Sequence, residues 1–294
     1  MIRYGSVCSG IEAATAAWHE LGWKPSFFSE IEAFPCAVLQ HHYPDVPLHG
    51  DFTTIKGDEY EPIDLLVGGT PCQSFSIAGL RGGLDDDRGN LALEFLRLAQ
   101  RTRPKWLVWE NVPGVLSSNG GRDFGSIIGG MVEIGYGIAY RVLDAQYFGV
   151  AQRRRRVFVV GCLGDAASAA AVLFERHSLQ GHFAEGTIKP IKARKVAGTL
   201  TTRTGSANDN YSVEQGHLIV TDGLPRWIMP IECERLQGFP DNFTSIPYRN
   251  KPADQCPDGP RYKALGNSMA VPVMRWIGER IQIVEQINRD RDMQ

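Results

Sequence analysis

Short apolar runs alternate with amphipathic stretches along the first half of the chain. The runs predict strands at residues 3–8, 25–29, 63–67, 105–109, 138–143 and 156–162. The stretch GNLALEFLRLAQRTRP has apolar residues at i, i+4, i+7 and i+8, which predicts a helix that Asn90 caps and Pro104 ends. Strands and helices in alternation are typical of a mainly parallel sheet covered by helices on both faces. The sequence therefore predicts an α/β fold with a doubly wound sheet, in which ligands bind at the carboxyl ends of the strands.

The pattern changes after residue 164. Residues 165–225 mix Ala, Gly, Thr, Asn and basic residues, with short strand-like pieces such as GTLTT and HLIVT. This composition predicts a smaller, loop-rich second domain. Two helices are predicted beyond it: one in PIECERLQGFPDNF, with Pro230 in its first turn and Gly238 at its end, and one after Pro272.

The composition is that of a globular protein with a sizeable core, because 43% of the 294 residues are hydrophobic and 22% are charged. No stretch approaches the roughly 18 consecutive apolar residues of a membrane span. The N-terminus lacks the basic start and apolar run of a signal peptide, so we expect a cytoplasmic protein with no membrane partner. Its six cysteines are scattered without a CxxC pair, which predicts free thiols and no metal site.

Charge is distributed unevenly along the chain. Residues 1–140 hold 10 Lys and Arg against 17 Asp and Glu, whereas residues 141–203 hold 11 against 4. A basic middle in an acidic chain indicates a localised surface for a polyanion such as nucleic acid, although a run of charges is more often only a solvated face.

The first predicted strand ends in a glycine turn, VCSGIEAAT, that opens a helix. The free backbone N–H groups at such a helix start suit a nucleotide-like ligand. Glu30 comes 20 residues after Gly10, at the end of the second strand, where an acid in doubly wound folds commonly accepts the ribose hydroxyls. Asp51 is a third candidate contact at a strand end.

Cys72 follows Pro71 where the third predicted strand ends, in LLVGGTPCQSFSIAG. A cysteine there is, by itself, more often a packing residue than a nucleophile. Glu110 ends the next strand after four apolar residues, and partial desolvation raises the pKa of a carboxyl and suits it to proton donation. Arg154 and Arg156 alternate onto one face of a later strand, where they would hold an anionic substrate and favour a thiolate. A solvated basic patch is the alternative for these arginines.

Five motifs resemble, in the same order, those of the C5-cytosine DNA methyltransferases of prokaryotes and phages. They are GGTPCQSFS, ENVPG, QRRRRVFVVG, RWIMPIECERLQGFPDNFT and YKALGNSMAVPV. The resemblance implies a Rossmann-like, S-adenosylmethionine-dependent catalytic domain at residues 1–164. It further implies a variable target-recognition domain with its supporting helix at 165–258, and a C-terminal helix at 259–294 that returns to the catalytic domain.

The chemistry that the resemblance implies begins with a cytosine flipped out of the duplex. Cys72 attacks C6 of that base, and Glu110 engages N3 and the exocyclic amine. Arg154 and Arg156 hold the base carbonyl and order the pocket. Addition of the thiolate makes C5 nucleophilic, so that C5 takes the methyl group of S-adenosylmethionine. The glycine-rich stretch 79–89 is expected to close over the base as a lid.

The resemblance also implies which residues bind the cofactor and the DNA. The expected cofactor contacts are Cys8, Ser9, Gly10, Ile11, Glu30, Ile31, Asp51, Phe52, Pro71, Asn267 and Ser268. The expected DNA contacts are Gln73, Ser76, Arg81, Lys192, Arg194, Lys195, Thr199, Thr201 and Arg203. We expect Thr199, Thr201 and Arg203 to read base edges and the basic residues at 192–195 to contact phosphates. The chain departs from the family's aromatic-Ser/Ala-Gly-x-Gly turn, because Cys8 and Glu12 replace the aromatic residue and the second glycine.

The sequence thus predicts a DNA (cytosine-5-)-methyltransferase that uses S-adenosyl-L-methionine and acts on double-stranded DNA as a monomer without a metal ion. A tRNA cytosine C5-methyltransferase and a catalytically inactive nucleic-acid-binding relative are the alternatives. A cysteine hydrolase is disfavoured, because no His stands at a recognisable partner position. The target sequence stays open, as does a restriction-linked, phage-protective or regulatory role.

Overall fold

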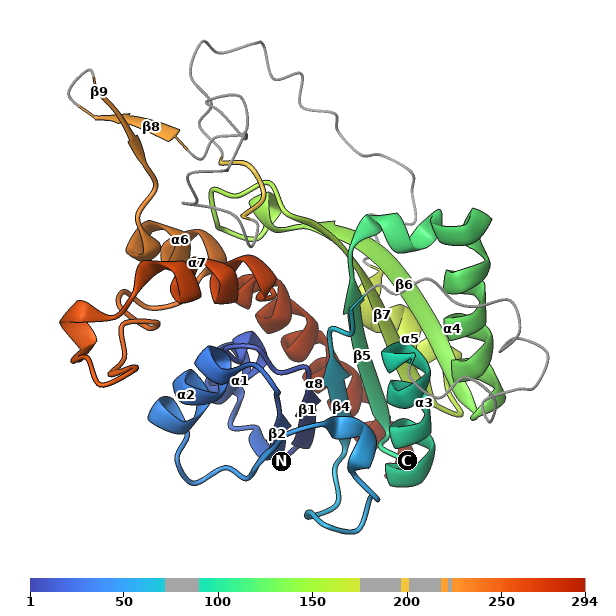
Figure 1. The fold of residues 1–294 in the computed structure, drawn as a ribbon. Helices are drawn as coiled ribbons and strands as arrows, with labels where there is room; N and C mark the ends of the chain where they lie inside the picture. Colours follow the sequence, from blue (N-terminus) through green and yellow to red (C-terminus); the bar gives the residue numbers. More distant parts are fainter. Residues whose placement is uncertain (72–89, 175–196, 201–217, 222–223, 294) are drawn as a thin grey trace, which may run out of the picture.

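The computed structural model describes residues 1–71, 90–174, 197–200, 218–221 and 224–293, and a seven-stranded sheet forms its centre (Figure 1). The strands are β1 (Arg3–Val7), β2 (Lys24–Ser29), β3 (Leu48–His49), β4 (Leu65–Gly68), β5 (Trp106–Asn111), β6 (Tyr136–Asp144) and β7 (Arg155–Leu163). Their spatial order is β3-β2-β1-β4-β5-β7-β6. Strand β7 is antiparallel to both of its neighbours, and the pairs from β3 to β5 are parallel. The doubly wound, mainly parallel sheet predicted from the sequence is confirmed.

The central strands are apolar on both faces, which explains why they appear in the sequence as continuous apolar runs. In β5, Trp106 and Val108 belong to one hydrophobic core, whereas Leu107 and Trp109 belong to the other. All six predicted strands are present, with ends that differ by a few residues. Strand β3 was not predicted, because two residues carry no periodic signal.

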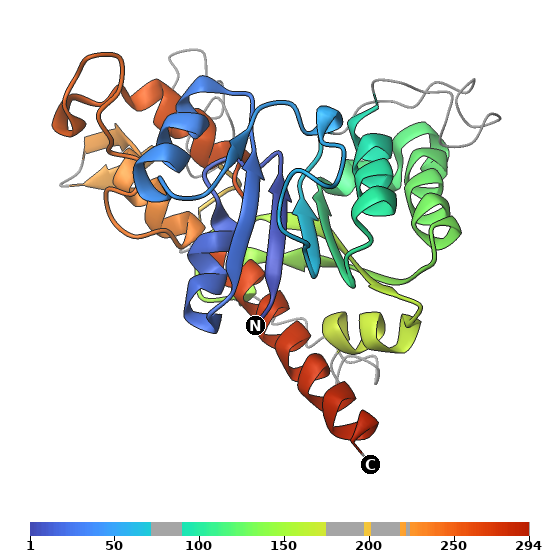
Figure 2. The ribbon, with the colours of Figure 1, turned by 90° about the horizontal axis from the view of Figure 1, so that it is seen from below.

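Helices cover both faces of the sheet (Figure 2). On one face, the apolar side chains come from α1 (Ala13–Trp18), α2 (Ala33–His42), α5 (Ala166–Leu173) and α8 (Val271–Asp292). On the other face, they come from α3 (Leu91–Thr102) and α4 (Arg122–Glu133). Asn90 caps α3 as predicted, because its Oδ1 accepts from Ala92 N at 3.0 Å. None of the helices in the described ranges is long and apolar enough to cross a membrane.

The remaining elements lie beside the carboxyl edge of the sheet (Figure 1). They are the antiparallel pair β8 (Leu218–Thr221) and β9 (Leu224–Trp227), and the helices α6 (Pro230–Gln237) and α7 (Asp258–Asn267). Helix α6 begins at Pro230 and ends at Gly238, whose φ of +81° is the left-handed conformation that glycine adopts readily, as predicted. Single 3₁₀ turns occur at His19–Leu21, Phe52–Thr54, Pro113–Leu116, Ser118–Gly121, Ala145–Tyr147 and Ala253–Gln255. The domain boundaries at 164 and 258 stay predictions.

The C-terminal helix is fastened to the N-terminal helix at a close crossing. Trp18 Nε1 donates a hydrogen bond to the Met274 carbonyl at 2.7 Å. A Cβ atom on Gly278 would lie only 2.5 Å from Cδ1 of Trp18. Only glycine therefore lets α8 approach the indole of α1 this closely.

We expect Gly278→Ala to lower the free energy of unfolding by about 1–3 kcal/mol, the usual cost of overpacking a core. Urea denaturation measures the change. Gly125→Ala is the matched control, because it lies in α4 with no atom within 4 Å of the added Cβ. This control should be stabilising by up to about 1 kcal/mol through helix propensity. A wild-type midpoint for Gly278→Ala would contradict the close packing of the two helices.

Candidate active site

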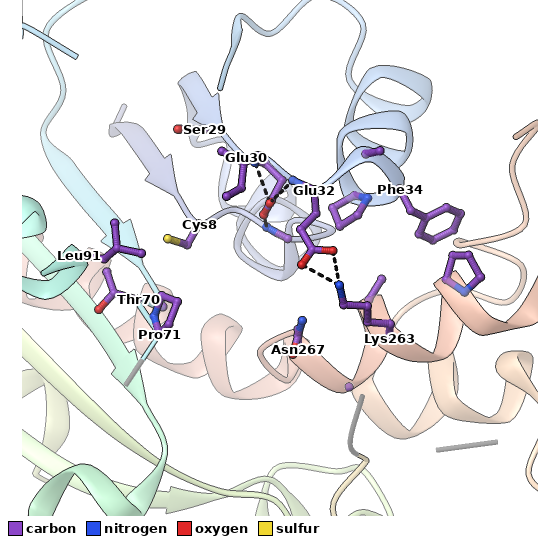
Figure 3. Close-up of a pocket in the computed structure, with 18 of the residues that line it drawn as sticks. Cys8, Ser29, Glu30, Glu32, Phe34, Thr70, Pro71, Leu91, Lys263 and Asn267 are labelled. Carbon is purple, nitrogen blue, oxygen red and sulfur yellow. Dashed lines mark hydrogen bonds and ion pairs between the residues drawn. The ribbon is translucent and has the colours of Figure 1, made fainter. Parts of the chain in front are cut away.

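The strand order reverses between β1 and β4, and a crevice opens at such a reversal because the connections leave in opposite directions. A cavity of about 720 Å³ lies there. Residues at the carboxyl ends of the strands line it, among them Cys8, Glu30 and Pro71 (Figure 3). Glu110 at the end of β5, and Arg154 and Arg156 at the amino end of β7, complete the lining. Because β7 runs antiparallel, its first residues reach the same edge of the sheet.

Glu30 is fixed at the cavity wall by backbone donors. Its carboxylate accepts from Gly10 N, Ile31 N and Glu32 N, each at 2.8 Å (Figure 3). Oε1 accepts two of these bonds and Oε2 accepts one, so the group is oriented and Oε2 can still accept a hydroxyl group. This is the arrangement expected of an acid that binds a ribose.

The turn after β1 contributes Cys8 and Gly10 to the cavity, both in the left-handed conformation with φ of +49° and +56°. Burial, with smaller contributions from the charges of Glu30 and Asp51, raises the pKa of Cys8 to about 12. The Cys8 thiol therefore stays protonated at neutral pH and is not a nucleophile.

The side chains that follow the two strand-end acids differ in exposure. Ile31 follows Glu30 and is 75% exposed, while Phe52 follows Asp51 and is only 4% exposed. Both line the cavity. Asp51 starts a 3₁₀ turn, and its Oδ1 accepts from Thr53 N at 3.0 Å. An apolar group bound here would cover the side chain of Ile31 and remove it from water, which would explain why an apolar residue is exposed at this position.

Glu110 and Arg156 form a buried ion pair at the other end of the cavity. Glu110 Oε1 lies 3.0 Å from Arg156 Nε, and the glutamate is 8% exposed. Burial raises the pKa of Glu110, and the charges of Arg156 and Arg154 oppose that shift. A Cβ on Gly69 would lie 3.1 Å from Glu110 Oε2, so glycine leaves the room that this carboxyl occupies. The arrangement suits a carboxyl that holds a proton inside a polar pocket.

The end of β4 is fastened to β5 by two side chains. Trp109 Nε1 donates to Thr70 Oγ1 at 2.9 Å, and Asn111 Nδ2 donates to the Thr70 carbonyl at 3.0 Å. Pro71, the next residue, lines the cavity. These bonds fix the backbone that leads into Cys72, which itself lies outside the described residues.

Arg154 is 2% exposed and joins three segments of the chain. Its guanidinium donates to the carbonyls of Leu200, Gly266 and Ser268 at 3.2, 3.0 and 2.7 Å. Gln152 supports the same junction, because its Oε1 accepts from Leu200 N at 3.1 Å and its Nε2 donates to Leu236 O at 2.8 Å. Arg154 therefore orders the pocket through backbone carbonyls, and its predicted contact with the base stays a prediction.

The structure brings most of the predicted residues that it describes into one cavity. The predicted residues that line it are Cys8, Gly10, Glu30, Ile31, Asp51, Phe52, Pro71, Asn267, Glu110, Arg154 and Arg156. Ile11 is fully buried in the core and Ser268 is 5% exposed; Ser9, Ile11 and Ser268 are absent from the lining of this cavity. Thr199 donates its hydroxyl to the Arg153 carbonyl at 2.6 Å. The predicted residues outside the described ranges are Cys72, Gln73, Ser76, Arg81, Lys192, Arg194, Lys195, Thr201 and Arg203, together with the expected lid.

Several lining residues were missed from the sequence: Phe34, Leu91, Tyr248, Arg249 and Lys263. Leu91 could have been found, because it opens the predicted helix next to Asn90. Tyr248 and Arg249 lie in an irregular segment without periodic pattern, and only the fold brings them to the cavity. Lys263 Nζ pairs with the Glu32 carboxylate at 2.5 Å and joins α7 to the start of α2 (Figure 3).

The fold and the cavity together define a doubly wound α/β enzyme that binds a nucleoside-containing cofactor beside a buried acid–arginine pair. The profile of the C-5 cytosine-specific DNA methylase family matches residues 2–203 and 177–283. The chain belongs to this family, as its five motifs predicted, and S-adenosylmethionine is its cofactor. The oriented Glu30, the exposed Ile31 and the apolar Phe52 fit an adenosine group.

Relatives with similar sequences are also named as methyltransferases. The Type II methyltransferase M1.ScrFI of Lactococcus lactis subsp. cremoris is 30% identical, over 95% of this chain and 77% of its own length. A protein of Escherichia phage P1 named DNA N-6-adenine-methyltransferase is 34% identical, over 95% of this chain. The match spans 61% of that phage protein, less than two thirds of its length.

A solved structure supports the fold. The Dnmt2 methyltransferase of S. pombe superposes with a TM-score of 0.70, over 98% of this chain and 100% of its own. Its sequence is only 16% identical, so this likeness concerns the fold alone. Within the described residues, no group of three or more His, Cys, Asp and Glu side chains could hold a metal ion.

We expect Arg154→Lys to lower the free energy of unfolding by about 1–3 kcal/mol, because lysine cannot serve all three buried carbonyls at once. Urea denaturation measures this loss. Arg155→Lys is the control, since Arg155 is the exposed neighbour on the same strand. Equal stability of the two variants would show that the carbonyl contacts of Arg154 contribute nothing.

Proposed function

We propose that this chain methylates C5 of cytosine in double-stranded DNA, with Cys72 as the nucleophile. The observation that carries the proposal is the buried Glu110–Arg156 pair in the same cavity as Glu30 and Asp51. One cavity thus offers a polar pocket for a base, beside Glu110 and Arg156, and a wall with two carboxylates, Glu30 and Asp51, for a nucleoside. Pro71 borders this cavity immediately before Cys72.

In the proposed reaction, the Cys72 thiolate forms an Sγ–C6 bond, and the C5–C6 double bond opens toward C5. Glu110 holds a proton at N3, so the electron density that moves into the ring is neutralised there. Arg156 keeps the Glu110 carboxyl in place. C5 is then nucleophilic and would take the methyl group that the cofactor supplies. Once C5 carries that group, loss of the C5 proton and cleavage of the Sγ–C6 bond restore the ring and free the thiolate, and the N3 proton returns to Glu110.

Electrostatics suit Glu110 to this role. Burial raises the pKa of Glu110, which favours its role as a proton donor, and the charges of Arg156 and Arg154 oppose that shift. Arg156 stabilises the carboxylate that remains if the proton moves fully to the base. Two buried opposite charges in contact avoid the high cost of one isolated charge.

S-adenosylmethionine, when bound, supplies a methyl group activated by the positive sulfonium. We propose that Glu30 accepts the ribose hydroxyls, that Ile31 and Phe52 flank the adenine, and that Asp51 and Asn267 bind polar groups of the cofactor. The protonated state of Cys8 in the same cavity keeps that thiol from competing for the methyl group.

The exposed rim beside the base pocket is proposed to contact the DNA backbone. In β7 the side chains alternate, so that Arg154 and Arg156 point inward while Arg153 and Arg155 are exposed. Neither exposed guanidinium pairs with a side chain of the described segments. Tyr147, in the preceding turn, is 80% exposed. Phosphates beside a flipped nucleotide must lie near this rim, because its base occupies the pocket beneath.

We propose that the enzyme acts as a monomer and needs no metal ion. We also propose the division into a catalytic domain at 1–164, a recognition domain at 165–258 and a returning helix at 259–294. Thr199 lies within the proposed recognition domain, where its hydroxyl donates to the Arg153 carbonyl, and it is the one predicted base-reading residue within the described ranges.

Cys72→Ser should abolish methyl transfer to duplex DNA while the affinity for S-adenosylmethionine stays within about twofold, because the substitution replaces one sulfur by oxygen and changes none of the proposed cofactor contacts. A labelled-methyl assay and calorimetric titration measure the two quantities. Wild-type transfer by this variant would refute the proposed nucleophile.

The name of the phage P1 relative points to a second candidate, methylation of adenine N6, although its match with this chain does not locate that activity. Bisulfite sequencing and nucleoside analysis of DNA from expressing cells separate 5-methylcytosine from N6-methyladenine. Methyl transfer to the N6 amine of adenine needs no bond between Cys72 Sγ and C6 of a base. Covalent trapping of the protein on 5-fluorocytosine DNA would therefore support only the cytosine reaction. A labelled-methyl assay with tRNA tests the RNA alternative.

Arg155→Gln should weaken binding to every duplex alike and reduce the slope of log K against log salt by about one, the effect of one lost phosphate contact. Filter binding over a salt series measures that slope. Arg291→Gln, an exposed arginine near the end of α8, is the control and should leave the slope unchanged. A wild-type slope for Arg155→Gln would remove this residue from the interface.

A further inference from the structure

Glu12 occupies an unusual place in the cofactor turn. It replaces the second glycine of the family turn, and its backbone has the left-handed φ of 60° and ψ of 60° that glycine adopts without strain. The residue is 1% exposed. A glutamate in a buried, left-handed position lowers the stability of the fold in two ways. The left-handed backbone is unfavourable for a residue with a Cβ, and the burial of a charged carboxylate costs solvation free energy.

The Glu12 carboxylate has several donors that offset this cost. Thr15 N and Thr15 Oγ1 donate to Oε2 at 3.2 and 2.6 Å, which makes Glu12 the cap of α1. Ser6 Oγ donates to Oε1. No ion pair with Glu12 occurs in the part of the chain that the structure describes. Burial raises the pKa of Glu12, and these hydrogen bonds oppose the shift.

The hydrogen bonds continue from Glu12 to the ends of three strands. Ser9 Oγ lies 3.1 Å from Ser6 Oγ and accepts from Ser29 N at 3.1 Å. Ser29 Oγ donates to the Gly50 carbonyl at 2.6 Å. Ser6 and Ser29 are 3% and 1% exposed, so these two members of the network are shielded from bulk water, and Ser29 also lines the cavity. The network joins the start of α1 to β1, β2 and the segment after β3.

Each of these three strand ends carries one of the proposed cofactor contacts. The turn after β1 carries Gly10, β2 is followed by Glu30, and the segment after β3 carries Asp51. The three groups bind one ligand together only if their spacing is set beforehand. The Glu12 network sets that spacing mainly through Glu12, Ser6 and Ser9, which do not line the cavity, and it reaches the lining at Ser29.

We propose that Glu12 is a positioning residue for the cofactor, which holds the turn and the three strand ends in their binding geometry before S-adenosylmethionine arrives. This inference rests on the proposed cofactor contacts. A preorganised turn raises the apparent affinity, because the ligand binds only the fraction of molecules with a competent geometry. Glycine at position 12 keeps the left-handed backbone but releases Ser6 and Thr15, so the turn samples other conformations.

The test compares cofactor affinity in Glu12→Gly, Glu12→Gln and Ser6→Ala with that of the wild type. Glu12→Gly should raise Kd for S-adenosylmethionine and S-adenosylhomocysteine by about tenfold, because buried hydrogen bonds are lost. Glu12→Gln keeps one acceptor oxygen and should regain part of the affinity. Calorimetric titration well below the melting temperature measures Kd. In turnover, KM for the cofactor should rise while kcat at saturation and Kd for DNA stay unchanged.

Asp165→Ala is the matched control. Asp165 also caps a helix, since its Oδ1 accepts from Ser168 N at 3.0 Å, but it lies before α5, away from the cavity. It should lower the melting temperature without changing Kd for the cofactor. A tenfold rise in the Kd of Asp165→Ala for the cofactor would show that the effect of Glu12→Gly comes from general instability, and it would overturn the proposal.

Two further results separate this inference from the proposed function. If Glu30→Ala leaves Kd unchanged, the assignment of the cofactor wall itself is wrong. If Glu30→Ala weakens binding but Glu12→Gly binds as the wild type does, only the positioning role fails. Should Glu12→Gly not fold, Ser6→Ala decides: it removes the hydrogen bonds of Ser6 Oγ to Glu12 and Ser9 and should raise Kd by about threefold. An unchanged Kd in Ser6→Ala overturns the proposal.

Discussion

The antiparallel placement of β7 between β5 and β6 is the constraint on which the active site depends. Parallel strands present only their carboxyl ends at the cavity edge, and an antiparallel strand presents its amino end there. The arginine run immediately before and within the start of β7 is therefore delivered to the last residues of β5. Alternation along the strand then selects Arg156 for Glu110 and leaves Arg155 exposed. A parallel strand in this position would carry the same residues to the opposite edge of the sheet.

Polar groups buried beneath the cavity share a common design. Glu110, Arg154 and Glu12 are all at most 8% exposed; the partners of Glu110 and Arg154 come from segments distant in sequence, whereas Glu12 is held by its near neighbours Ser6 and Thr15. Such groups are costly to bury, and removing one partner leaves the other unsatisfied. The site is consequently rigid where the chemistry needs fixed geometry. The exposed residues at its rim, such as Tyr147 and Ile31, are left to meet ligands.

Much of this architecture could be predicted from the sequence. The central strands are apolar on both faces, and the sequence of α3 shows a capping asparagine and apolar residues at helical spacing. The positions of Glu30, Asp51 and Glu110 followed from the rule that strand ends converge at one edge. Tyr248 and Lys263 could not be found in this way, since their approach to the cavity depends on how α7 packs against α2. The contacts of Arg154 were equally hidden: the motif predicts that an arginine faces inward, but not that carbonyls of residues 200, 266 and 268 receive it.

Helix α1 is synthesised early and its packing partner α8 late, so the fold can be completed only after α8 has been made. Trp18 and Met274 are joined across 256 positions of sequence, and the first strand is central in the sheet while the last helix covers its face. A chain emerging from the ribosome can form β1 to β5 early, but the indole of Trp18 stays uncovered and Asn267 is absent until α7 and α8 have been synthesised. Contacts of such long range slow folding, and an unfinished chain exposes an apolar sheet face that chaperones recognise. Growing chains therefore pass through a long interval in which most of the sheet exists and the cofactor wall does not.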